Sequence, residues 1–94
     1  MEIVYTVLYD ERVLRDDIPG LGATIKKRIQ KTIAQKLTTS PQLFGKPLRG
    51  QLHPSWALRV GDHRVLYEIK GSEVWVWAIR HRSEAYILKY LQML

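Results

Sequence analysis

The chain has 94 residues, of which 46% are apolar and 26% charged, and it contains no cysteine. This composition is typical of a single globular domain, here residues 1–94, and it excludes disulfides, thiolate metal ligands and a cysteine nucleophile. The formal net charge is +6, which favours a polyanionic partner such as nucleic acid or an acidic protein.

The charge is unevenly distributed along the chain. Residues 1–22 contain two basic and five acidic residues, whereas residues 23–94 contain thirteen basic and four acidic ones. No segment approaches the roughly 18 consecutive apolar residues of a membrane span, and the first residues lack the basic stretch of a signal peptide. We therefore expect a cytoplasmic protein that does not associate with membranes, with its positive field on the later elements.

The first half of the chain predicts a strand followed by a helix. Residues 2–9 are rich in β-branched and aromatic residues and predict a strand. Residues 10–22 predict at most a short helical turn, and their acidic side chains are expected to be solvated. Residues 23–37 predict an amphipathic helix with an apolar stripe and unbalanced basic residues on its other faces. The stripe consists of Ile25, Ile29, Ile33 and Leu37, and the basic residues are Lys26, Lys27, Arg28, Lys31 and Lys36.

The middle of the chain predicts an ordered loop and then a β-hairpin. Residues 38–55 are rich in turn-forming residues and predict the loop. Residues 56–60 and 63–70 alternate apolar and other residues on either side of Gly61-Asp62, which predicts a hairpin with a two-residue turn.

The last third of the chain completes the sheet. Residues 73–81 predict a third strand after a turn at Gly71-Ser72, and residues 83–94 predict a short helix with Ser83 as its N-cap. The predicted fold is α+β. It is an antiparallel sheet of the N-terminal strand and a three-stranded meander, with helices packed on one face and a short C-terminal helix.

The hairpin contains an unfavourable pair of like charges. A two-residue turn at Gly61-Asp62 places Arg59 directly opposite Arg64, on the face that the core does not use, together with Leu66 and Glu68. A single arginine there is ordinarily a solvated side chain paired with an acid. Two opposed arginines instead favour an anion site, because planar guanidinium groups bind phosphate in a bidentate manner.

Further basic groups follow at the end of the third strand. A two-residue turn at Gly71-Ser72 places His81 on the face of Arg64, whereas a shift of one residue places Arg80 there. Together with Tyr86, these groups suit cleavage of RNA without a metal. That chemistry needs a base for the 2′-hydroxyl proton, an acid for the leaving oxygen and cations for the phosphorane. An aromatic ring can also stack on a nucleobase.

Other functional sites are not indicated. The histidines His53, His63 and His81 lack metal-ligand spacing, and no glycine-rich phosphate loop is present, so we expect neither a metal nor a cofactor. Trp75 and Trp77 are expected to belong to the core or to a surface that binds a partner.

Three segments carry a family resemblance. In this order and spacing, GKPLRG (45–50), WALRVGDHRVLYEI (56–69) and IRHRSEAY (79–86) resemble the RelE/ParE superfamily of toxins from type II toxin–antitoxin modules. The resemblance implies the same helix-and-meander fold and a cognate RelB-like antitoxin that wraps the toxin. For the RelE branch it also implies cleavage of mRNA on the ribosome without a metal.

The resemblance also implies roles for individual residues. Arg64 matches the arginine that stabilises the scissile phosphate, Arg80 the proposed proton donor, and Tyr86 the tyrosine that stacks on or activates the substrate. His81 completes the expected catalytic set. The residues expected to bind RNA phosphates are Arg59, Arg82, Lys46 and Arg49.

One feature departs from the RelE pattern. RelE toxins have a pair of lysines at places that here hold Ser55 and Ala57, which leaves the general base open among Tyr86, His81 and His53. The alternatives to an endoribonuclease are a ParE-like toxin that inhibits DNA gyrase and a catalytically weak relative that only binds RNA.

Overall fold

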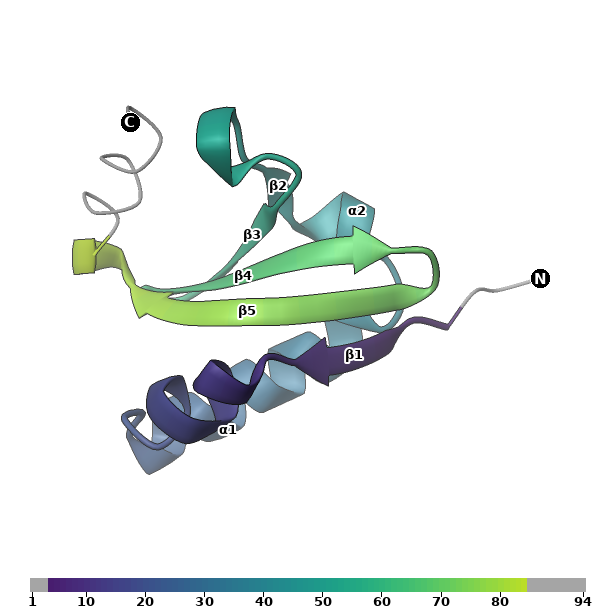
Figure 1. Ribbon diagram of the computed structural model, residues 1–94. Coiled ribbons are helices and arrows are strands. Elements are labelled where there is room, and N and C mark those ends of the chain that lie inside the picture. Colours follow the sequence, from purple (N-terminus) through teal and green to yellow (C-terminus); the bar gives the residue numbers. More distant parts are fainter. Residues whose placement is uncertain (1–3, 85–94) are drawn as a thin grey trace.

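The computed structural model describes residues 4–84, which form one five-stranded sheet with helices packed against it (Figure 1). The strand order across the sheet is β1-β5-β4-β3-β2. The strands are β1 (Thr6–Tyr9), β2 (Lys46–Pro47), β3 (Trp56–Val60), β4 (His63–Lys70) and β5 (Glu73–His81). The helices are α1 (Ala23–Thr32) and α2 (Pro41–Phe44), with the further helical turns η1 (Val13–Asp17), η2 (Ile33–Leu37), η3 (Gly50–Leu52) and η4 (Arg82–Glu84).

The predicted meander is confirmed, since β3, β4 and β5 pair antiparallel in sequence order. The N-terminal strand is the exception to the predicted antiparallel sheet, because β1 runs parallel to β5. The connection from β1 to the meander passes through α1, and such a crossover brings a strand back in the parallel direction. The segment 38–55, predicted as a loop, adds the short helix α2 and the two-residue strand β2 at the edge of the sheet.

Both hairpin turns contain two residues, as predicted, and each begins with a glycine at positive φ. Gly61 has φ 59° and Gly71 has φ 61°, whereas no other residue type in the described part has positive φ. This is the pattern of a type II′ turn, which matches the twist of the adjoining strands. The turn at Gly61 fixes the predicted register, in which Arg59 lies directly opposite Arg64.

A β-bulge interrupts the pairing of β4 with β5. Leu66 pairs with Ala78, but its neighbour Tyr67 pairs with Val76, so Trp77 is the extra residue. The bulge shifts the register by one residue and places Arg80 opposite Arg64, while His81 lies opposite His63. It therefore decides between the two registers that the sequence left open.

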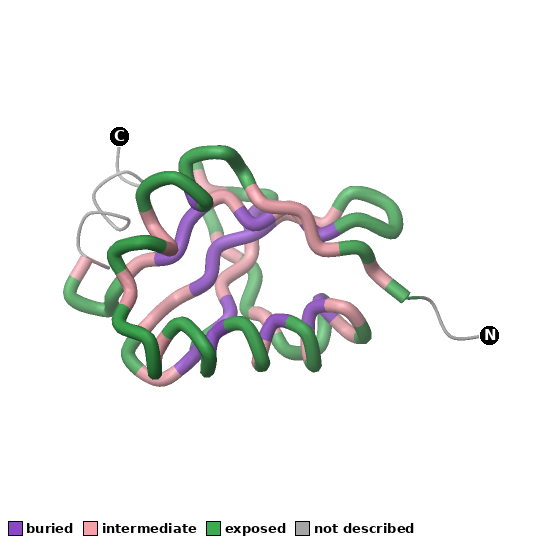
Figure 2. Tube along the Cα trace, turned by 90° about the horizontal axis from the view of Figure 1, so that it is seen from below, coloured by how far each residue is buried: buried purple, intermediate pink, exposed green. Residues whose placement is uncertain are grey.

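The core lies between α1 and one face of the sheet. The helical stripe predicted over residues 23–37 is confirmed, because Ile29, Ile33 and Leu37 are buried against the strands. Figure 2 shows the solvent side of this helix as mostly exposed. The buried strand residues of this cluster are Leu58, Val60, Val65, Tyr67, Val74, Val76 and Ile79.

The opposite face of the sheet is only partly open. The expectation of an open face at Leu66 is wrong, because Leu66 and Ala78 are each 1% exposed. The loop before β3 is tied to the bulge, since the Trp77 indole donates a hydrogen bond of 3.0 Å to the Ser55 hydroxyl. Of the polar groups on this face, the arginines near the β3–β4 turn remain accessible.

Two remaining expectations concern the C-terminal helix and membrane-spanning segments. The predicted C-terminal helix, including Tyr86, lies outside the described residues, which end with the 3₁₀ turn η4. Between residues 4 and 84, no helix combines the length and the apolar character that crossing a membrane requires.

Candidate functional site

Three arginines form one row across the sheet. Arg59 in β3 pairs with Arg64 in β4, and Arg64 pairs with Arg80 in β5. Side chains of paired residues point to the same side of a sheet, so this row lies on the face opposite α1. Lys46 in β2 pairs with Ala57, two residues before Arg59, and therefore joins the same face. We call Arg59, Arg64 and Arg80 the arginine row.

Arg64 is held in place by uncharged groups. Its Nη1 atom donates hydrogen bonds to the carbonyl oxygens of Gly61 (3.3 Å) and His63 (3.1 Å), at the end of the hairpin. Within residues 4–84, neither Arg59 nor Arg64 forms an ion pair with a carboxylate. The backbone carbonyls thus orient the Arg64 guanidinium while its full positive charge stays available to an anion.

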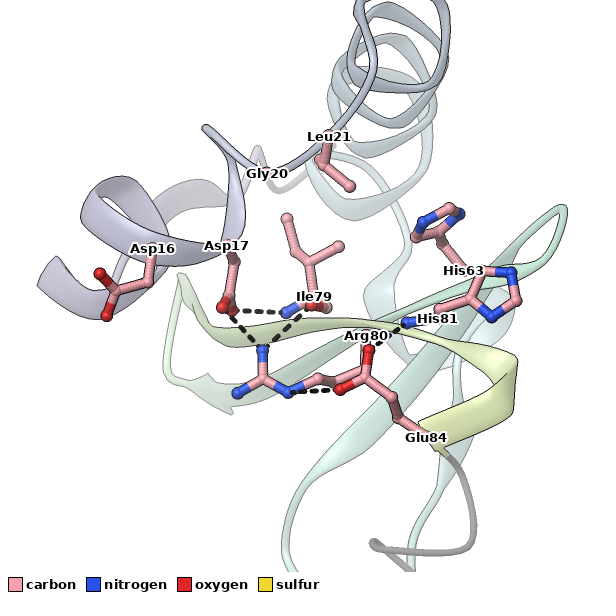
Figure 3. A pocket seen from close by; sticks show the side chains of 9 residues that line it. All are labelled: Asp16, Asp17, Gly20, Leu21, His63, Ile79, Arg80, His81 and Glu84. Carbon is pink, nitrogen blue, oxygen red and sulfur yellow. Dashed lines mark hydrogen bonds and ion pairs between the residues drawn. The ribbon is translucent and has the colours of Figure 1, made fainter.

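Arg80 has a different environment at the edge of the sheet. Its Nη1 atom lies 2.7 Å from Oδ1 of Asp17, and its Nε atom lies 3.7 Å from Oε2 of Glu84 (Figure 3). The second oxygen of Asp17 accepts a hydrogen bond of 3.0 Å from the backbone N–H of Ile79. One oxygen of Asp17 therefore accepts a backbone hydrogen bond from β5 where β1 no longer pairs with it. The other oxygen balances the charge of Arg80.

A cavity of about 440 Å³ lies next to this ion pair. It brings two imidazoles, one guanidinium and three carboxylates around one space, as Figure 3 shows. The rings of His63 and His81 meet edge to face, with their centroids 5.2 Å apart. Its lining residues are Asp16, Asp17, Gly20, Leu21, His63, Ile79, Arg80, His81 and Glu84.

The two histidines of the cavity differ in their hydrogen bonding. Nδ1 of His81 lies 2.8 Å from the Ser83 hydroxyl, whereas Nδ1 of His63 is buried with no partner in the described structure. A buried ring nitrogen without a partner loses hydrogen bonds that water would supply, so it is costly unless a ligand reaches it. Among the described residues, no three histidine, aspartate or glutamate side chains are arranged so that they could hold a metal ion.

The structure brings together only some of the residues predicted for the site. Arg64 and Arg80 share the arginine row with Arg59 and Lys46, but His81 lies on the other face, opposite His63. Two further predicted residues lie at its margins. Arg82 reaches Oδ1 of Asp62 at 3.6 Å beside the β3–β4 turn, and Arg49 is exposed immediately before η3. Tyr86 is outside the described residues.

Asp17 and His63 are among the cavity residues that were not foreseen as part of a site. The expectation that the acidic segment is solvated is wrong for Asp17, whose side chain is 12% exposed, although it describes Asp16 at 59%. Asp17 contacts residues 62 positions away, so no local pattern could have distinguished it. His63 could have been placed from the hairpin register, because it pairs with Val60 and therefore lies on the same face as this buried residue.

The positions of the missing RelE lysines are now defined. Ser55 is 6% exposed and its hydroxyl oxygen accepts the Trp77 hydrogen bond, so this side chain does not point at the arginine row. Ala57 lies between Lys46 and Leu66. Lys46, in the neighbouring strand β2, therefore brings an amino group next to Ala57.

The whole sequence was also compared with known protein families. The family described as "ParE toxin of type II toxin-antitoxin system, parDE" matches residues 7–86. The chain belongs to this family of toxins. A comparison with curated proteins found no match. The predicted resemblance to the RelE/ParE superfamily is thereby confirmed.

Solved structures of RelE toxins share the fold. The toxin–antitoxin complex RelBE2 from Mycobacterium tuberculosis matches with 29% identity and a TM-score of 0.79, over 86% of this chain and 94% of that one. The isolated RelE toxin of E. coli matches with 25% identity and a TM-score of 0.69, over 96% and 99%. The RelB–RelE complex of Methanococcus jannaschii, at 24% identity, TM-score 0.68 and coverages of 86% and 96%, supports the fold alone. The chain is thus a toxin of a type II toxin–antitoxin system with a RelE-like α+β fold.

Proposed function

We propose that this toxin is a ribosome-dependent endoribonuclease that cleaves translated mRNA. The observation that carries the proposal is the arginine row, in which Arg59 and Arg64 face each other without a carboxylate partner among residues 4–84. Two opposed cations, of which Arg64 is oriented by backbone carbonyls, suit a group carrying more than one negative charge. The phosphorane formed during RNA cleavage is such a group.

The proposed reaction needs no metal or cofactor. The 2′-oxygen of the ribose forms a bond to phosphorus, and the bond from phosphorus to the 5′-oxygen breaks. A base takes the 2′-hydroxyl proton, with Tyr86 and His53 as the candidates, and Arg80 donates a proton to the departing oxygen. His81 takes neither role, because it lies on the other face of the sheet from the arginine row. Arg64 stabilises the phosphorane, while Arg59, Arg82, Lys46 and Arg49 hold flanking phosphates. The products are a 2′,3′-cyclic phosphate and a 5′-hydroxyl.

Dependence on the ribosome follows from the weak base. The RelE lysine pair is absent, and the Ser55 hydroxyl accepts a hydrogen bond from the Trp77 indole. A chain with phosphate-binding cations but no strong base gains most from a substrate already held for in-line attack. Such positioning can contribute roughly 7 kcal/mol or more to a reaction. The ribosome, holding mRNA in the decoding site, would supply it.

Induction in a bacterial host tests this proposal. We expect primer extension on a translated message to show cuts within codons, and these cuts should disappear when translation is blocked. The new ends should carry a 5′-hydroxyl, and EDTA treatment of the toxin should not abolish cleavage when magnesium is restored for the ribosomes. A 5′-phosphate at the cut would show that water attacks instead and would contradict the mechanism.

A second candidate function is inhibition of DNA gyrase, and the match to the ParE family favours it. A toxin of this type would cut no message but would block supercoiling by purified gyrase. The supercoiling assay and the primer-extension assay therefore give opposite results for the two candidates. A chain that is inactive in both but still binds RNA would be the catalytically weak relative.

The partner of this toxin is proposed to be a RelB-like antitoxin. Two of the similar solved structures contain a RelB antitoxin bound to its toxin. This chain exposes large apolar side chains that an antitoxin segment could cover, with Leu43 at 75% and Leu14 at 55% exposure. An acidic segment that folds on binding would also neutralise the positive field. Purification from the native operon should yield a complex, and a toxin that elutes alone would contradict this.

A further inference from the structure

We propose that the solvent-facing side of α1 is a second binding surface for the phosphate backbone of single-stranded RNA, continuous with the arginine row. We call this surface, formed by Lys27, Arg28 and Lys31, the basic helix face. It rests on the proposed function in taking RNA as the polyanion. All three side chains are exposed, and none of them forms an ion pair within the described part of the chain.

The sequence of α1 is poorly suited to stabilising the helix by charge. Its first turn has no acidic residue, although acids there would favour the helix dipole. Lys27 and Lys31 are four residues apart, and like charges at this spacing repel. The other two helical lysines have packing contacts: Lys26 lines an apolar cavity, and the Lys36 amino group lies 5.2 Å from the centre of the Phe44 ring. Within residues 4–84, neither Lys27 nor Lys31 has an ion pair or a cation–π contact to explain its presence.

Arg28 connects this face to the arginine row. A Cβ atom built at Gly61 would lie 2.8 Å from Nη1 of Arg28, so the Arg28 guanidinium rests over the β3–β4 turn. Arg64 donates to the carbonyl oxygen of the same glycine. The two guanidinium groups thus reach one turn from opposite sides of the sheet, and a strand of RNA bound at the row meets Arg28 as it leaves over the turn.

The composition of the face indicates nucleic acid rather than a protein segment. The other outward residues, Thr24, Ala34 and Gln35, are small or uncharged, and no aromatic or large aliphatic side chain lies among them. Protein interfaces depend on buried aromatic or aliphatic anchors and are depleted in lysine at their centres. Phosphate contacts require only long cationic side chains, and they are independent of base sequence. Leu43, one of the apolar residues that an antitoxin segment could cover, is exposed on α2 and not on this face.

Salt-dependent binding tests the proposal with the full chain. The probe is a fluorescein-labelled 2′-O-methyl oligouridine, which cannot be cleaved because it has no free 2′-hydroxyl, so the result does not depend on catalysis. We expect the double variant Lys27→Gln/Lys31→Gln to reduce the slope of log K against log salt by about 1.4, or about 0.7 for each lost phosphate contact. At ~0.1 M salt this corresponds to about a fivefold loss of affinity per contact.

Matched controls separate this surface from net charge and from folding. Lys70→Gln removes one charge at the far end of β4, where the lysine stacks on Trp75, and it should leave the slope unchanged. Glutamine has about the same helix propensity as lysine, so circular dichroism should show an unaltered fold. A slope for the double variant equal to that of the parent or of Lys70→Gln would overturn the proposal. Weaker antitoxin binding with unchanged RNA binding would overturn it too, because the face would then belong to the protein partner.

The proposed function can fail independently of this inference. A toxin that inhibits gyrase and cuts no message would still show the slope change if the basic helix face binds RNA phosphates. Conversely, an active endoribonuclease whose slope is unaffected by the helix variants would retain the proposed function and exclude the second surface.

Discussion

Arg64 and Arg80 are direct neighbours in the sheet, but their surroundings are opposite in kind. Arg64 is oriented by two backbone carbonyl oxygens and has no carboxylate partner among residues 4–84, whereas Arg80 contacts Asp17 at 2.7 Å and Glu84 at 3.7 Å. Neutral acceptors orient a cation without balancing it, and carboxylates do both. A shared place in the register therefore does not give two arginines the same availability to a ligand.

The difference arises from their positions in the sheet. Arg64 belongs to β4, which has a neighbouring strand on each side, so no other element can bring an acid to it along the sheet edge. Arg80 lies in β5 beyond the last residue paired with β1, and η1 brings Asp17 to that uncovered edge. We therefore expect changes at Arg64 to affect function and changes around Arg80 to affect folding first.

The largest expected effect is the loss of activity in Arg64→Ala. A lost charge-assisted contact to the phosphorane should raise the barrier by about 3 kcal/mol, which is a loss of roughly a hundredfold or more in cleavage. Folding and antitoxin binding should be nearly unaffected, as measured by urea unfolding and co-purification. Arg15→Ala is the matched control, because this arginine is exposed and its ion pair is with exposed Asp16. If the Arg64 variant arrests growth as the parent does, its catalytic role is wrong.

Much of this fold could be predicted from local pattern alone. Alternation around Gly61-Asp62 specifies a two-residue hairpin, and the turn then determines the pairing of Arg59 with Arg64. The four-residue spacing of Ile25, Ile29 and Ile33 likewise specifies which side of α1 is buried. In both cases the spacing of apolar residues in the sequence equals the residue repeat of the strand or of the helix. The prediction therefore needs only residues that are close together in the sequence.

The features that could not be predicted depend on contacts between distant segments. The bulge at Trp77 decides which residue faces Arg64, and it is stabilised by a hydrogen bond to Ser55, 22 residues earlier. The parallel pairing of β1 and the burial of Asp17 also join residues more than 60 positions apart. The residue types of the candidate site could thus be predicted from the sequence. Which of its arginines are paired with carboxylates, and which are available to a ligand, could not.

A buried tyrosine on the other face of β4 makes the stability of the fold depend on pH. Tyr67 is fully buried and donates a hydrogen bond of 2.6 Å to the carbonyl of Pro41, and burial raises the pKa of Tyr67 to about 12. The folded chain therefore holds this proton more tightly than the unfolded chain, whose tyrosine titrates near 10. The stabilisation is complete below pH 10 and is lost as the pH rises toward 12, by about 2 kcal/mol.

Urea unfolding between pH 9 and 12 measures this loss. Tyr67→Phe should be less stable at neutral pH, because the Pro41 carbonyl loses the Tyr67 hydrogen bond, and should show a shallower alkaline decline. The pKa of Tyr9 is also raised by burial, but Tyr9 contributes equally to both proteins. An unchanged decline in the variant would show that the alkaline loss arises elsewhere.

The next effect is at the paired end of the row. Asp17→Asn keeps an acceptor for the Ile79 N–H but removes the charge that balances Arg80, and hydrogen bonds to charged groups contribute about 1.5 kcal/mol or more. We expect a corresponding loss in the free energy of unfolding. Asp16→Asn is the control, since this exposed carboxylate should contribute less than about 0.5 kcal/mol. Equal losses in the two variants would mean that Asp17 is no more structural than its neighbour.

The smallest expected effect belongs to Glu84, the second carboxylate near Arg80. Its oxygen lies 3.7 Å from Nε of Arg80, and the two side chains are 45% and 37% exposed, so solvent weakens the attraction. Glutamine keeps an oxygen that can accept from the His81 N–H, a contact of 3.3 Å. Glu84→Gln should therefore reduce stability by less than about 0.5 kcal/mol, and added salt should reduce the difference further. A loss as large as that of Asp17→Asn would show that both carboxylates, and not Asp17 alone, balance the charge of Arg80.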